Sequence, residues 1–407
     1  MTKSDDKKVP ALRFKGFTDD WEQHKLGNMA NILRGASPRP IKDKKWFDTN
    51  SRIGWIRISD VTSQNGRVYT LGQHLSKKGQ EKTHVVSSQT LLLSIAASVG
   101  YPVITYVETG VHDGFIIFDK PKFNLDFMFF KLQSIQNIWS KYGQPGSQVN
   151  INSSIVANTS ISIPNIKEQK KISILLKKIE ENIHLQQRKL EQLNLLQRAL
   201  LQRIFANRNL QPDLRFTNFS GAWEQRKFES LIYPEKIKNK NNLQLPAYSI
   251  SNKNGFIAQT DQFGKDNTYS KTDKKTNYIV NPGAFAYNPA RINVGSIGYQ
   301  NLATPVLVSS LYEVFKTNSQ INDLFLIYWF KTDKFFNQIK KYEEGGVRQY
   351  YFLDKLLFSE IIIPKDAREQ QKISKILKKL DYLFSLQQNK INKLQELKRS
   401  FLQNMFI

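Results

Sequence analysis

The feature that most constrains the fold of this chain is an internal duplication with a period of about 200 residues. A block that contains Leu-Arg-Phe, a second Phe and Trp-Glu-Gln begins at Pro10 and returns in the same order at Pro212. A second block, an Ile-Pro pair followed by Glu-Gln, begins at Ile163 and again at Ile363. Because chance does not produce two such blocks in one order and spacing, the chain is a tandem duplication.

Each copy contains short strands followed by a long helix. Runs of β-branched and aromatic residues, such as those that begin at Gly54 and Gly114, alternate with Gly, Asn and Asp turns. A helical patch begins near the end of each copy, at Leu125 and at Asp323, and a Gly-containing loop and a final strand follow it. The pattern predicts an α+β protein with two homologous strand-rich domains, each followed by a long helix.

The repeat also predicts where the segments begin and end. It indicates a charged N-terminal tail at 1–9, a first strand-rich domain at 10–163, a first spacer helix with its linker at 164–211, a second strand-rich domain at 212–363 and a second spacer helix at 364–407. With 407 residues, the chain is long enough for each domain to bury its own core.

Both predicted helices carry an apolar stripe at heptad positions a and d for more than four heptads, which is typical of a coiled coil. A single helix would expose this stripe to water, so we predict that the two helices pack on each other. The seam residues are Ile172, Leu176, Ile179, Ile183, Gln186, Leu190 and Leu193 in the first helix, and Ile373, Leu377, Leu380, Phe384, Gln387, Ile391 and Leu394 in the second.

Gln186 and Gln387 are equivalent polar positions in this seam, and we predict that they face each other. A helix from about Lys167 to Phe205 is roughly 58 Å long at 1.5 Å per residue, and Gln186 lies near its middle. Because the pairing would occur in a parallel and in an antiparallel pair, it leaves the polarity of the two helices open.

The charge of the chain indicates its class of partner. There are 60 Lys and Arg residues against 35 Asp and Glu residues, a formal net charge of +25. Such an excess favours a polyanion, because each neutralised phosphate releases a condensed counterion. Nucleic acid is the first candidate and an anionic membrane surface the second.

The longest apolar stretch, 91–105, is interrupted and too short to span a bilayer, and 1–9 has no apolar segment typical of a secretory signal. We therefore expect a cytoplasmic protein that binds nucleic acid and no membrane.

The residues favour a binding protein over an enzyme. The chain has no cysteine, which excludes disulfides, thiolate zinc sites and a Cys nucleophile. Its five histidines have no metal-ligand spacing. Gly264-Lys265 is not part of a phosphate-binding P-loop, and Asn288-Pro289 lacks the second Pro and the aromatic residue of an adenine methyltransferase motif. We expect no catalytic residue, no metal and no cofactor in this chain.

The repeated motifs resemble those of one protein family, the specificity subunits of type I restriction-modification systems. The resemblance rests on the Leu-Arg-Phe opening with its Trp-Glu, a Gly-x-Gln or Gly-x-Arg loop, the Ile-Pro then Glu-Gln-x-x-Ile helix entry and the two-fold repetition. The segment 281–298 resembles a recurring part of that family's recognition domains, and 91–100 looks like its more divergent counterpart. The match covers nearly all of the chain.

This resemblance implies a function and a set of partners. Each of two target-recognition domains would bind one half of a bipartite, asymmetric sequence in double-stranded DNA. The two helices would form an antiparallel coiled coil with pseudo-two-fold symmetry, which sets the unread gap between the halves. They would also dock two modification subunits, which carry S-adenosylmethionine and methylate adenine. Restriction subunits would add translocation and cleavage that depend on ATP and Mg.

Candidates for base reading are side chains that match base edges. Arg and Gln make bidentate contacts to guanine and adenine, and several such residues follow or resemble the Gly-containing loops. The predicted DNA-binding residues are Arg57, Gln148, Asn288, Arg291, Arg348, Gln349 and Tyr350. A structural role in a turn is an equal alternative for each of them. The lysine clusters at 42–45, 236–240 and 271–275 are equally well explained by phosphate contacts and by solubilising loops.

Two other functions fit the sequence. One is a self-contained DNA enzyme, which would transfer methyl groups from S-adenosylmethionine to DNA as the purified chain. The other is a stand-alone basic coiled-coil protein that binds DNA or regulates, without a methyltransferase partner. Such a protein would be recovered alone and fully functional.

Overall fold

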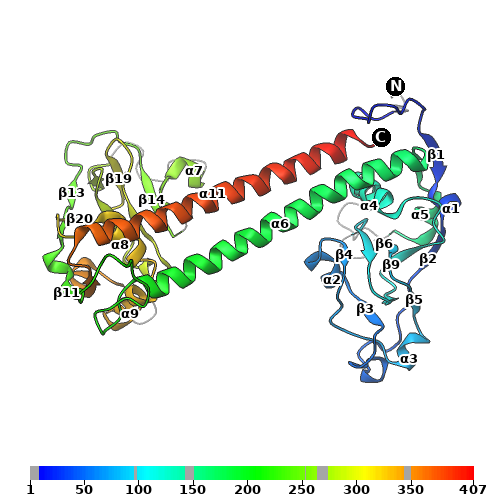
Figure 1. The fold of residues 1–407 in the computed structure, drawn as a ribbon. Helices are drawn as coiled ribbons and strands as arrows, with labels where there is room; N and C mark the ends of the chain where they lie inside the picture. Colours follow the sequence, from blue (N-terminus) through cyan, green and yellow to red (C-terminus); the bar gives the residue numbers. More distant parts are fainter. Residues whose placement is uncertain (1–8, 96–98, 143–150, 253, 264–273, 343–349) are drawn as a thin grey trace. The chain divides into compact units, whose positions relative to one another are not determined.

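A computed structural model describes residues 9–95, 99–142, 151–252, 254–263, 274–342 and 350–407. Its contacts divide the chain into two compact units, Met1–Gln187 with Asn389–Ile407 (unit 1) and Arg188–Gln388 (unit 2). Each unit contains one strand-rich domain and part of each of two long helices, α6 (Ile166–Ile204) and α11 (Ala367–Asn404) (Figure 1). The prediction of an α+β protein with two strand-rich domains, each followed by a long helix, is confirmed.

The domain of unit 1 has three sheets, with the strand orders β1-β10, β2-β9-β6-β7-β4 and β3-β8-β5. The strands are β1 (Glu22–Lys25), β2 (Asn31–Arg34), β3 (Gly54–Ile56), β4 (Arg67–Val68), β5 (His84–Val86), β6 (Thr90–Ser94), β7 (Pro102–Thr105), β8 (Thr109–Val111), β9 (Phe115–Asp119) and β10 (Ser160–Ile163). The helices are α1 (Leu26–Met29), α2 (Ile58–Ser63), α3 (Lys77–Gln80), α4 (Leu125–Ser134) and α5 (Ser153–Asn158).

The central strand β6 is buried on both faces. Leu91 and Leu93 share one apolar core with Phe127 of α4, whereas Leu92 packs in a second core with Val61 of α2. Successive strand residues point to opposite faces, so a strand covered on both sides has an unbroken apolar run instead of an alternating one. This explains the three consecutive leucines.

Unit 2 repeats the framework. The orders β11-β21 and β12-β20-β17-β18 correspond to β1-β10 and β2-β9-β6-β7, and β13-β16-β19 and β14-β15 form two further sheets. The strands are β11 (Glu224–Lys227), β12 (Ile232–Pro234), β13 (Ile237–Lys238), β14 (Tyr248–Ser251), β15 (Gly255–Ala258), β16 (Tyr278–Val280), β17 (Phe285–Tyr287), β18 (Ile297–Tyr299), β19 (Val306–Val308), β20 (Glu313–Thr317) and β21 (Glu360–Ile363). The helices are α7 (Gln259–Phe263), α8 (Asp323–Trp329), α9 (Asp333–Tyr342) and α10 (Leu353–Phe358).

The repeated motifs form equivalent contacts that hold each domain to the start of a long helix. The Arg13 guanidinium donates to both carboxylate oxygens of Glu168, at 2.8 and 2.9 Å, and Glu168 is 0% exposed. Arg215 and Glu369 form the same pair in unit 2, also at 2.8 and 2.9 Å. The glutamine after each glutamate accepts a hydrogen bond from the backbone of the Asn that caps α4 or α8. The motifs are therefore duplicated because each copy needs the same joint.

The two long helices run antiparallel in each unit. In unit 1, Ile172 near the start of α6 shares a core with Met405 just after the end of α11. In unit 2, Ile204 at the end of α6 shares a core with Ile373 near the start of α11. The polarity that the sequence leaves open is thus antiparallel, as the family resemblance implies.

Every predicted seam residue is buried or half-buried. Two more polar residues lie in the stripe, Gln197 in α6 and Lys398 in α11, and each has a charged partner. Lys398 Nζ lies 2.7 Å from Glu180 Oε1 in unit 1, and Gln197 donates to Asp381 at 2.6 Å in unit 2. The two central glutamines of the seam belong to different units, so their facing each other stays a prediction.

Candidate nucleic-acid interface

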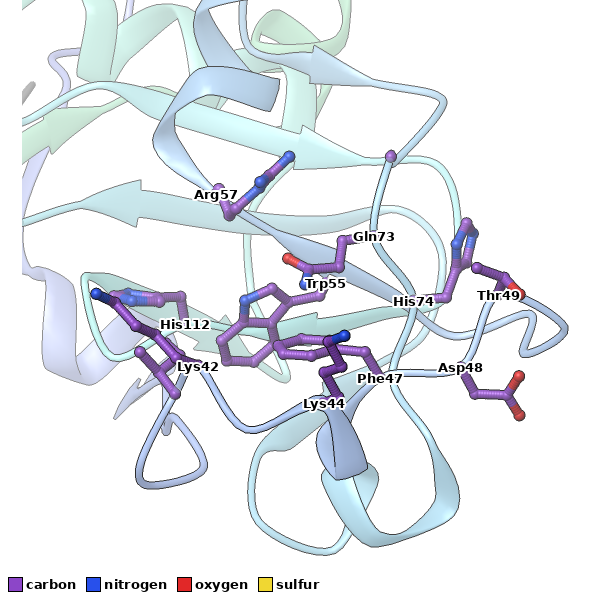
Figure 2. Close-up of a pocket in the computed structure, with 12 residues that line it drawn as sticks. Lys42, Lys44, Phe47, Asp48, Thr49, Trp55, Arg57, Gln73, His74 and His112 are labelled. Carbon is purple, nitrogen blue, oxygen red and sulfur yellow. The ribbon is translucent and has the colours of Figure 1, made fainter.

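A pocket of about 780 Å³ opens in unit 1 beside the sheet β3-β8-β5 (Figure 2). Four stretches of chain line it: the loop around a short 3₁₀ helix (Lys44–Trp46), β3 with the residue after it, 72–74, and His112 at the end of β8. Backbone pairing brings them together, because the N–H of Trp55 donates to the carbonyl of Gln73 at 2.7 Å and β3 pairs with β8.

The floor of the pocket is aromatic. Trp55 is 1% exposed, because it packs in a small core with Ile53 and Leu75. Phe47 is half-buried against the same core. The ring centroid of His112 lies 5.6 Å from that of Trp55 (Figure 2). A molecule that enters the pocket therefore meets Phe47 and His112 first, with Trp55 beneath them.

Two contacts hold the His112 ring at one nitrogen. Its Nδ1 lies 2.9 Å from the backbone nitrogen of Gly114 and 3.0 Å from a carboxylate oxygen of Asp113. Burial lowers the pKa of His112, and the carboxylate of Asp113 opposes part of that shift. The imidazole is thus uncharged near pH 7, and its ring offers aromatic surface to a ligand.

Arg57 extends from the end of β3, at the start of α2. The Asp60 carboxylate accepts from its backbone N–H at 3.0 Å and lies 3.4 Å from its Nε. The terminal nitrogens of the guanidinium have no hydrogen-bond partner in the described part of the chain, and Gly72 lies beside one of them. Arg57 is therefore anchored through one edge, and its other edge is available to a ligand.

The rim of the pocket is positively charged. Lys42 and Lys44 are exposed, and neither forms an ion pair with any residue that the structure describes. Lys45, the residue after Lys44, is paired with Asp43 at 2.8 Å, and its ammonium lies over the Trp46 ring. One exposed aspartate is the counter-charge among the lining residues. The excess of cations suits an anionic ligand such as a DNA phosphate.

In unit 2, the structure brings Tyr350 close to the turn that contains Asn288 and Arg291. The Asn288 carboxamide oxygen accepts from the backbone N–H two residues further on, at 3.0 Å, which is turn chemistry. Arg291 is exposed at the end of this turn. Tyr350 stacks on Phe352 with ring centroids 5.5 Å apart. The N–H of Tyr351 donates to the carbonyl of the residue after Asn288 at 3.1 Å, which places Tyr350 close to the turn.

The remaining predicted residues, Gln148, Arg348 and Gln349, lie outside the described residues and stay predictions. Of the pocket residues, Arg57 was predicted from the sequence, whereas Gln73 and His112 were not. No sequence spacing connects these two to Arg57. The pairing of β3 with β8 brings His112 to the pocket, and the backbone contacts of β3 with 73–74 bring Gln73 there.

Other kinds of site find no support in the described ranges. There, no group of three His, Asp or Glu side chains has the placement to hold a metal ion. None of the helices in those ranges has a stretch long and apolar enough to cross a membrane.

Comparisons with protein-family models and with solved structures point to the same family. The model of the type I restriction modification DNA specificity domain matches the chain twice, over residues 18–195 and 224–396. The S subunit of a type I restriction-modification system from M. genitalium aligns over 98% of this chain and 99% of its own, with 14% identity and a TM-score of 0.60. A structure described as the basis of complex assembly and conformational transition of the type I R-M system aligns over 94% and 96%, with 14% identity and a TM-score of 0.56. At 14% identity, these two similarities show a shared fold.

Proposed function

Because the chain belongs to the family of type I restriction-modification DNA specificity domains, which it contains twice, we propose that it reads a bipartite, asymmetric target in double-stranded DNA. Unit 1 reads one half of the target and unit 2 the other. The chain itself is non-catalytic and acts in the cytoplasm, in a complex with two modification subunits and, where present, restriction subunits. S-adenosylmethionine, ATP and Mg belong to those partners.

The observation that carries this proposal is one framework with two different sets of polar side chains. The sheets β2-β9-β6-β7 and β12-β20-β17-β18 have the same order. Beside this shared sheet, unit 1 presents Arg57 and His112 around a pocket at the sheet β3-β8-β5, whereas unit 2 presents Asn288, Arg291 and Tyr350 around a turn after β17. Because different side chains match different base edges, two such units read two unlike half-sites.

The number of modification subunits is supported by exposed leucines at repeat-equivalent positions of the long helices. Leu185 and Leu397 are each 42% exposed in unit 1, and their repeat equivalents in unit 2, Leu386 and Leu196, are 45% and 49% exposed. These leucines lie on α6 and α11 but outside the seam. Exposed apolar residues at equivalent places favour the same partner twice, so we expect two modification subunits per chain.

Purification of the complex tests this proposal. We expect wild type to co-purify with two modification subunits, and the methylome of the cell to contain a motif of two specified halves separated by an unread gap. The double variant Leu185→Glu with Leu397→Glu should co-purify with only one modification subunit. The double variant Leu386→Glu with Leu196→Glu should do the same. Leu311→Glu is the control, because Leu311 is 77% exposed and lies on neither helix. A chain recovered alone and fully functional, or an uninterrupted motif, would contradict the proposal.

A further inference from the structure

The pocket of unit 1 has the volume of a small-molecule site. Its volume of about 780 Å³ lies within the range of about 300–1,000 Å³ that small-molecule sites occupy. In a duplex, a base edge lies at the floor of a groove about 8.5 Å deep, so the side chain that reads it must project from the protein. Gln73 and His112 do not project, because both are half-buried and line a concave wall.

The groups in the pocket match the two parts of a nucleotide. Phe47 and His112 offer aromatic surface, on which a base of any kind stacks. The Gln73 carboxamide makes no hydrogen bond to any described residue, and Gln is the side chain that pairs with adenine in a bidentate manner. Lys42 and Lys44 on the rim lack ion-pair partners in the described ranges and suit the phosphate.

We propose that this pocket binds one nucleotide of the target DNA outside the helical stack, with its base against Phe47 and His112 and its phosphate at Lys42 and Lys44. Arg57 and Gln73 supply the hydrogen bonds to the base edge. This inference rests on the proposed function, because it assumes that unit 1 contacts the target. It adds that the contact includes an unstacked nucleotide, whereas groove reading involves only stacked bases.

The affinity for duplexes with one missing base tests this inference. Extruding a base costs a few kcal/mol when it is paired and least when its partner is absent. Once the target is known, the full chain without modification subunits is titrated with target duplexes in which each base of the half-site read by unit 1 faces an abasic site in turn. Leaving the modification subunits out ensures that base extrusion by a methyltransferase does not contribute.

We expect one abasic position to tighten binding by about tenfold or more, which corresponds to about 1.4 kcal/mol. In the variant Gln73→Ala with Lys44→Ala, that gain should fall below about threefold. The matched control is Lys78→Ala with Gln192→Ala, which removes the same groups from exposed positions outside the pocket and should keep the gain.

Two results would overturn the inference. One is a scan in which no abasic position tightens binding, and the other is an undiminished gain in the variant with Gln73→Ala and Lys44→Ala. Failure of the proposed function gives a different result, since wild type would then bind the intact target no better than a scrambled duplex of the same length.

Discussion

Replacing Arg13 with Met tests whether the duplicated ion pairs hold each domain to its helices. Arg13 binds both oxygens of Glu168, at 2.8 and 2.9 Å, and Glu168 is 0% exposed. Met keeps the apolar part of the side chain but leaves a buried carboxylate without its partner. Breaking a buried pair in this way destabilises a protein by about 3–5 kcal/mol, whereas an exposed pair contributes about 0–1 kcal/mol.

Thermal and urea unfolding measure this loss. In a domain of about 150–250 residues, each kcal/mol shifts Tm by about 2–4 °C, so Arg13→Met should lower the Tm of unit 1 by about 6–20 °C. Arg215→Met breaks the equivalent pair in unit 2, with the same distances, and should cause the same loss. Arg52→Met is the control, because its pair with Glu108 spans 3.2 Å at 86% and 46% exposure and should contribute less than about 1 kcal/mol.

A second variant separates the cause of the loss. Adding Glu168→Gln to Arg13→Met removes the uncompensated charge, so the double variant should regain a large part of the stability. A loss below about 1 kcal/mol in Arg13→Met, or a double variant less stable than the single one, would refute the reasoning.

Two further predictions concern a buried lysine and the helix length. Burial lowers the pKa of Lys131 to about 8, whereas the unfolded chain has a lysine pKa near 10.4. The unfolded state therefore binds more protons between these values, and the free energy of unfolding should rise by on the order of 3 kcal/mol as pH increases through this window. Lys131→Met should remove that slope in urea unfolding, and an equal slope in both proteins would count against it. Four residues inserted into α6 lengthen it by about 6 Å. The unread gap in the methylome motif should then grow by about two base pairs at 3.4 Å each, and changed halves with an unchanged gap would contradict the proposal.

The parts of the fold that could be predicted from the sequence depend on local pattern. The heptad stripe predicts a helix from about Lys167 to Phe205, and α6 is Ile166–Ile204. The helical patch at Leu125 is α4, and the final strand before Pro164 is β10. Each of these elements shows its period within its own segment, so no distant contact is needed to recognise it.

Short elements and distant contacts could not be predicted in this way. The helices Ser153–Asn158 and Leu353–Phe358 have only six residues each, too few for an apolar period to show. The pairing of Arg13 with Glu168 joins residues 155 positions apart. The duplication did contain a signal for it, because both residues lie in the blocks that recur, but recurrence alone does not say which repeated residues touch.

The candidate site was predictable only in part. Arg57 was selected because Arg matches guanine, and its place in the pocket comes from the end of β3. In the sequence, Trp55 cannot be distinguished from other apolar strand residues, and Gln73 and His112 lie in loops that contain no motif. The parallel pairing of β3 with β8 brings His112 to Trp55, and parallel pairing joins segments far apart in the chain. Gln73 is placed by a backbone hydrogen bond from Trp55 to its carbonyl.

Exchange of one recognition domain tests the central claim most directly. Residues 26–163 are replaced by the corresponding segment of another specificity subunit, the complex is expressed in cells without other methyltransferases, and the methylome is sequenced. The account predicts that one half of the motif changes, while the other half stays as in wild type. A motif in which both halves change, or in which neither changes, would contradict the claim that two units of one chain read two halves of one target independently.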